Sequence, residues 1–86
     1  MASVRIGARN AARVGGVLHK ISHGRSVPTD VRANANYWAS AMRRRMDRRD
    51  LRAVARLLDD VGADRSLSPR SQREARYWAA FLEAQL

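Results

Sequence analysis

Apolar residues return every three or four positions in four stretches of the chain, which is the spacing of helices buried along one side. The stripes consist mainly of aliphatic residues, and the second and fourth each contain one tryptophan. They comprise Val14, Val17, Leu18 and Ile21; Val31, Ala35, Trp38 and Met42; Leu51, Val54, Leu58 and Val61; and Ala75, Trp78, Leu82 and Leu86. The pattern predicts an all-α protein of four short helices.

Glycine, proline and capping residues mark the ends of these helices. We expect the first helix to end with Gly24 in the left-handed cap conformation, and the second to begin directly after Pro28. The third should end at Gly62. Ser68 is expected to cap the fourth helix, and Pro69 to open it.

The boundary between the second and third helices carries no glycine or proline. At 100° per residue, however, the apolar side shifts by about 120° between the two stripes, which favours a break. Asp47 is a suitable N-cap for the third helix, with Asp50 three residues later. One continuous helix that uses two different faces is the alternative.

The chain aligns with itself at an offset of forty residues. Ten identical pairs are Arg5/Arg45, Arg9/Arg49, Val14/Val54, Leu18/Leu58, Arg25/Arg65, Ser26/Ser66, Ala35/Ala75, Tyr37/Tyr77, Trp38/Trp78 and Ala39/Ala79. This alignment predicts one domain over 1–86 with an internal repeat, 5–45 and 46–86, in which two tandem helical hairpins of about forty residues pack in a bundle-like arrangement. Chance similarity between helices rich in alanine and arginine is the alternative.

Charge narrows the class of partner. The 86 residues carry a formal net charge of +9, and all the basic residues except Lys20 are arginines. So much positive charge on a small domain favours acidic partners, such as nucleic acid or an acidic protein surface. Arginine binds phosphate and carboxylate with a bidentate fork, so the surface is suited to oriented contacts.

The charge is concentrated in residues 43–56, which hold seven arginines and two aspartates, a formal charge of +5. On a helix, Arg45, Arg49, Arg52 and Arg56 fall within about 60° of one another, on the side opposite the apolar stripe of the same segment. The candidate binding residues are therefore Arg43, Arg44, Arg45, Arg48, Arg49, Arg52 and Arg56, with help from Arg5, Arg9 and Arg13. A solvated face paired with nearby aspartates is the simpler interpretation.

Two functions fit this surface. The first is a non-enzymatic module that binds DNA or RNA mainly through the phosphate backbone. The second is a structural or assembly protein, for example a small component of a phage particle or of a large bacterial complex, whose arginines dock on acidic protein surfaces. Both hypotheses place the chain in the bacterial cytoplasm or within a phage particle, as a homo-oligomer or as part of a larger assembly.

Other kinds of site have little support in the sequence. There is no cysteine, and His19 and His23 supply only two ligands of a tetrahedral metal site, so we expect no metal. We expect no enzyme activity and no cofactor, because the chain has neither a phosphate-binding glycine loop nor a nucleophile with its base. No apolar run is long enough to cross a membrane.

The aromatic pairs Tyr37-Trp38 and Tyr77-Trp78 allow two interpretations. They can stack on unpaired bases. Their place on the apolar stripes instead predicts that both tryptophans belong to the core, with each tyrosine at its rim and its hydroxyl in water.

Overall fold

The fold was obtained as a computed structural model that describes residues 6–44 and 46–86. These residues form four α-helices and no strand, as the sequence predicts. The helices are α1 (Ala8–Ser22), α2 (Thr29–Ala41), α3 (Arg48–Ala63) and α4 (Pro69–Ala84).

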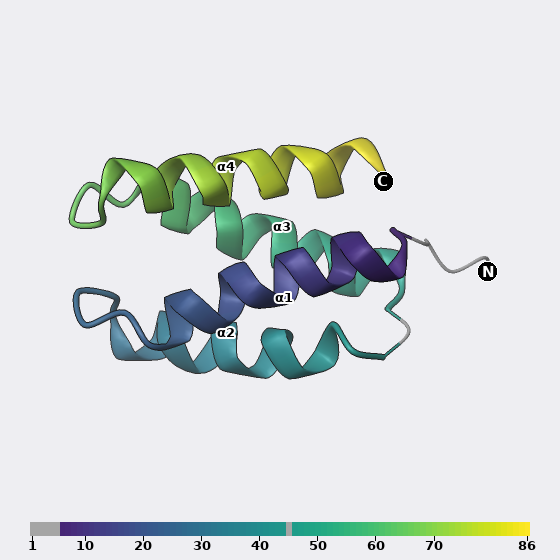
Figure 1. Cartoon of the computed structure of the whole chain (residues 1–86), viewed down its shortest axis with the longest axis horizontal. Coiled ribbons are helices and arrows are strands. Elements are labelled where there is room, and N and C mark those ends of the chain that lie inside the picture. Colours follow the sequence, from purple (N-terminus) through teal and green to yellow (C-terminus); the bar gives the residue numbers. More distant parts are fainter. Residues whose placement is uncertain (1–5, 45) are drawn as a thin grey trace.

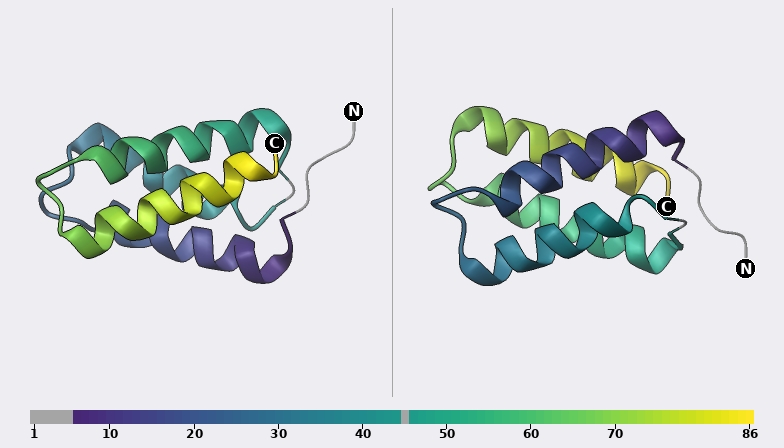
Figure 2. Two further views of the ribbon diagram at one scale, coloured as in Figure 1. Left: turned by 90° about the horizontal axis from the view of Figure 1, so that it is seen from above. Right: turned by 60° about the horizontal axis from the view of Figure 1, so that its bottom comes forward.

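The helices pair as two antiparallel hairpins, α1 with α2 and α3 with α4 (Figure 1). Contacts between the hairpins are fewer and run from α2 to α3 and from α1 to α4, whereas α1 and α3 do not pack directly on each other. The two hairpin loops lie at one end of the bundle, and the connection from α2 to α3 lies at the other (Figures 1 and 2). The predicted pair of helical hairpins is confirmed.

The break between α2 and α3 is confirmed, and the alternative of one continuous helix is wrong. The chain leaves α2 after Ala41 in a turn, and α3 begins at Arg48. The Asp47 carboxylate accepts a hydrogen bond from the Asp50 backbone N–H at 2.8 Å. Such a cap stabilises a helix by about 1 kcal/mol because it satisfies an amide that has no partner within the helix.

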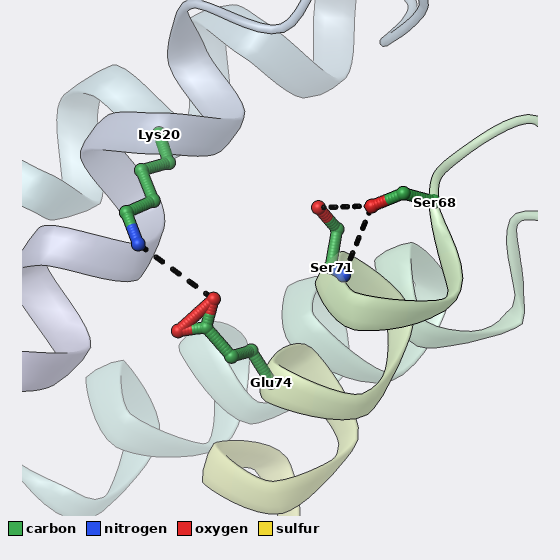
Figure 3. A network of polar contacts seen from close by, with 4 residues as sticks. All are labelled: Lys20, Ser68, Ser71 and Glu74. Atoms are coloured by element: carbon green, nitrogen blue, oxygen red, sulfur yellow. Dashed lines mark hydrogen bonds and ion pairs between the residues drawn. The ribbon is translucent and has the colours of Figure 1, made fainter.

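The predicted start of α4 is also confirmed. Ser68 Oγ accepts a hydrogen bond from the Ser71 backbone N–H at 3.2 Å, and Pro69 follows as the first helical residue (Figure 3). Proline is favourable at this position because it fixes a helical φ and lacks the amide proton that would need a partner.

Two expectations about glycine are corrected. Gly24 is not left-handed, since the one positive φ among the described residues belongs to Gly7. Gly24 is instead required by a close approach: a Cβ there would lie 2.7 Å from Val27 Cγ2. Helix α3 does not end at Gly62 but continues to Ala63, with Gly62 buried against α4.

The second hairpin loop is held by a side chain that the first loop lacks. The Asp64 carboxylate accepts hydrogen bonds from the hydroxyl and the backbone N–H of Ser66, at 2.6 and 2.9 Å. These two bonds hold the pKa of Asp64 below its ordinary value. At the corresponding position, forty residues earlier, the first loop has Gly24.

The core lies between the two hairpins, and six pairs of positions forty residues apart are buried in both. Both members of three pairs are completely inaccessible: Val14 and Val54, Leu18 and Leu58, and Ala35 and Ala75. The loops correspond as well, since the backbone N–H groups of Val27 and Leu67 donate to the carbonyl oxygens of Gly24 and Asp64 at 3.3 and 3.2 Å.

The aromatic pairs depart from this correspondence. Trp78 is buried as predicted, whereas Trp38 is only partly buried at the edge of the core. Trp78 has an aromatic neighbour that Trp38 lacks: the Phe81 ring packs edge-on against Trp78 with centroids 5.4 Å apart, and forty residues earlier the chain has Ala41. Both tyrosines are exposed, as predicted.

Candidate nucleic-acid interface

The described arginines of residues 43–56 lie on two neighbouring segments of the chain. Arg43 and Arg44 occupy the turn after α2, and the others follow on α3. The described members of this group are all exposed: Arg43, Arg44, Arg48, Arg49, Arg52 and Arg56. We call this group the α3 basic surface. Arg5 and Arg45 lie outside the described residues.

The amphipathic pattern of α3 is what turns these arginines outward. Leu51, Val54 and Leu58 share one side of the helix and are almost fully buried in the core. With 100° between successive residues, Arg49 and Arg56 necessarily fall on the opposite side. They are seven residues apart, so at 1.5 Å per residue they span about 10 Å along the helix.

The two other described candidate arginines, Arg9 and Arg13, are exposed on α1. They therefore lie on a different helix from Arg49, Arg52 and Arg56 of α3 (Figure 1).

The arginines of the α3 basic surface form no ion pair with a described carboxylate. Across 6–44 and 46–86 the single ion pair joins Lys20 Nζ to Glu74 Oε1 at 3.7 Å, between α1 and α4 (Figure 3). Asp47 is engaged in capping α3. The simpler interpretation, a face paired with its own aspartates, is therefore not what the described side chains show.

The outer side of the first hairpin differs sharply from that of the second. A groove of about 550 Å³ between α1 and α2 is lined mainly by alanine and glycine. The positions forty residues after its small lining residues Ala8, Ala12 and Gly16 are Arg48, Arg52 and Arg56. In the second hairpin, arginines of α3 therefore occupy the positions that line the open groove in the first hairpin.

One acidic pair beside the basic surface was missed by sequence reasoning. The Asp59 carboxyl on α3 lies close to that of Glu83 on α4, and hydrogen bonding to Asp59 together with repulsion from its charge raises the pKa of Glu83. The corresponding residues of the first hairpin are His19 and Arg43. Knowing which residues of α3 and α4 face each other would have been needed to find this pair.

This acidic pair predicts a pH effect on stability. A carboxyl whose pKa is raised on folding stabilises the protein at pH values below its unfolded pKa, and this contribution is lost as the pH rises through the folded value. We therefore expect Glu83→Gln to be at least as stable as the unmodified chain at neutral pH, with the difference disappearing in acid. Urea unfolding between pH 4 and 7.5 measures this effect.

Glu74→Gln is the matched control for that experiment, since it removes the same charge but loses the pairing with Lys20. It should not raise stability at neutral pH. A Glu83→Gln chain that is less stable than the unmodified chain at neutral pH would show that the Asp59–Glu83 repulsion is not significant.

Neither a metal site nor a membrane-spanning helix is found among the described residues. The described residues contain no group of three or more histidine, cysteine, aspartate or glutamate side chains arranged to hold a metal ion. None of the helices in the described part of the chain is both long and apolar enough to cross a membrane.

Comparison with protein-family models, with curated proteins and with solved structures gives no match for this chain.

Proposed function

We propose that this chain is a small, non-enzymatic helical module that binds nucleic acid mainly through the phosphate backbone. One observation carries the proposal. The six described arginines of the α3 basic surface are exposed, and none of them forms an ion pair with a described carboxylate. Such a surface releases the counterions of a polyanion when it binds, which is a large source of affinity for DNA and RNA.

The composition of α3 supports backbone contact over the reading of base sequence. Asparagine, glutamine and arginine are the side chains that commonly recognise a base edge with two hydrogen bonds. Of these, α3 contains arginine but no asparagine or glutamine. Its arginines can grip phosphate oxygens with two parallel hydrogen bonds each. Binding should therefore depend little on nucleotide sequence.

The salt dependence of binding tests the proposal directly. We expect the observed association constant for duplex DNA to fall with salt with a logarithmic slope of about −5, because about six phosphate contacts each contribute about 0.9. Fluorescence anisotropy with two unrelated duplexes of equal length should give similar affinities and slopes. A slope near zero, or no binding at low salt, would overturn the proposal.

A role in assembly is the second candidate, and the groove between α1 and α2 favours it. Its small lining residues would allow the backbone of a partner protein to approach closely. In that case the arginines would contact carboxylates in a complex of fixed stoichiometry. Material purified from its source at low salt distinguishes the two functions: a defined complex that survives nuclease favours assembly, whereas nucleic acid released by high salt favours the first proposal.

A further inference from the structure

The solvent-facing side of α2 carries a shallow recess of about 420 Å³ that extends to Arg44 in the following turn. An aromatic ring, an amide, a hydroxyl and a guanidinium line it together with two alanines, and the residues are Ala33, Asn36, Tyr37, Ser40, Ala41 and Arg44. No acidic side chain is among them. Arg44 belongs both to this recess and to the group that we call the α3 basic surface.

The Tyr37 ring is both accessible and restrained. The residue is 55% exposed, which is unusual for so large a side chain with apolar neighbours. Trp38 contacts the ring edge-on, with centroids 4.8 Å apart. The Tyr37 hydroxyl accepts a hydrogen bond from Arg44 Nη2 at 3.2 Å. A ring held in this way loses little conformational freedom when a planar group stacks on it.

The other lining groups complement a nucleotide. Asn36 and Ser40 are exposed one helical turn apart, and they offer hydrogen-bond donors and acceptors to the edge of a base. Arg44 offers a charge and two or more donors to a phosphate. A base within a duplex is already stacked on its neighbours, so only an unpaired base can reach Tyr37.

We propose that this recess binds one unpaired nucleotide of single-stranded DNA or RNA. The base stacks on Tyr37, Asn36 and Ser40 contact its edge, and Arg44 contacts the adjoining phosphate. This inference rests on the proposed function and adds to it a preference for single strands, whereas the remaining arginines bind single and double strands alike.

The second hairpin contains a natural comparison for Tyr37. Tyr77 is 65% exposed and makes the same edge-on contact with Trp78, at 5.0 Å between centroids. The positions that correspond to the polar lining residues Asn36, Ser40 and Arg44 are Arg76, Ala80 and Ala84. Tyr77 therefore has an exposed ring without the hydroxyl and amide groups that lie beside Tyr37.

The test measures binding of one mixed-sequence oligonucleotide of about 12 nucleotides, as a single strand and as a duplex, by fluorescence anisotropy. We expect Tyr37→Leu to weaken single-strand binding about five- to a hundredfold, the usual loss of one stacked base, and to change duplex binding less than about twofold. Tyr37→Phe keeps the ring and should stay within about threefold of the unmodified chain. Tyr77→Leu should change neither affinity by more than about twofold.

The possible outcomes separate this inference from the proposed function. Equal losses for Tyr37→Leu and Tyr77→Leu, or equal losses on single strand and duplex, would overturn the nucleotide site. An unchanged single-strand affinity in Tyr37→Leu would overturn it while leaving phosphate binding intact. A chain that binds neither oligonucleotide would overturn both proposals. Far-ultraviolet circular dichroism of each variant confirms that the helices are retained.

Discussion

Replacing Arg49, Arg52 and Arg56 together by glutamine is expected to lower the affinity for duplex DNA on the order of a hundredfold near 0.1 M salt. The three side chains are exposed on α3 and make no ion pair with a described carboxylate. Losing three phosphate contacts should also flatten the logarithmic salt slope by about 3 units, equally for unrelated sequences. Glutamine is a good helix former, so α3 should remain folded.

A second triple variant controls for net charge. Arg25, Arg65 and Arg70 are exposed at the end of the bundle that holds the hairpin loops, away from the connection between α2 and α3. Their replacement by glutamine removes the same three charges and should reduce affinity far less. Equal losses in the two triple variants would mean that overall charge, and not the α3 basic surface, determines binding.

The arginine stripe was predictable because it depends on one helix alone. The apolar residues from Leu51 to Val61 place the core side of α3, and the remaining positions must face solvent. The caps Asp47 and Ser68 were predictable for the same reason, since each bonds to an amide three residues away. Local pattern also placed both tyrosines at the surface.

Features that depend on contacts between helices were not predictable in this way. Trp38 is less buried than Trp78, and the Phe81 ring that packs on Trp78 has no counterpart in the first hairpin, where the chain has Ala41. The raised pKa of Glu83 requires Asp59 to face it from another helix. Gly24 has an ordinary negative φ and is needed because Val27 folds back against it. Each of these features depends on contacts that the spacing of residues along the sequence does not determine.

The two hairpins share a buried side and differ on their outer sides. Six pairs of positions forty residues apart are buried in both hairpins, whereas exposed positions forty residues apart mostly carry different residues. The first hairpin carries a groove and a recess, whereas the second carries most of the α3 basic surface. A duplicated hairpin in which the core was retained and the outer sides diverged accounts for this distribution, and we propose that origin for the fold.

If two core positions are equivalent, truncating their side chains should lower the free energy of unfolding by similar amounts. Leu18 and Leu58 are forty residues apart, and both are completely inaccessible in the centre of the bundle. Leucine to alanine at such sites costs about 2 to 5 kcal/mol, because apolar contacts are lost and a cavity remains. A domain of 86 residues has a free energy of unfolding of about 4 to 13 kcal/mol, so either change removes a large share of it.

We therefore expect Leu18→Ala and Leu58→Ala to lower the free energy of unfolding by similar amounts, within about 1 kcal/mol of each other, as measured by urea denaturation. Leu67→Ala, at a partly buried position, should cost clearly less. Trp78→Ala should cost more than Trp38→Ala, because only Trp78 is buried beneath Phe81. If Leu18→Ala and Leu58→Ala differed by several kcal/mol, the two hairpins would not be energetically equivalent, and their matching burial would be poor support for a duplication.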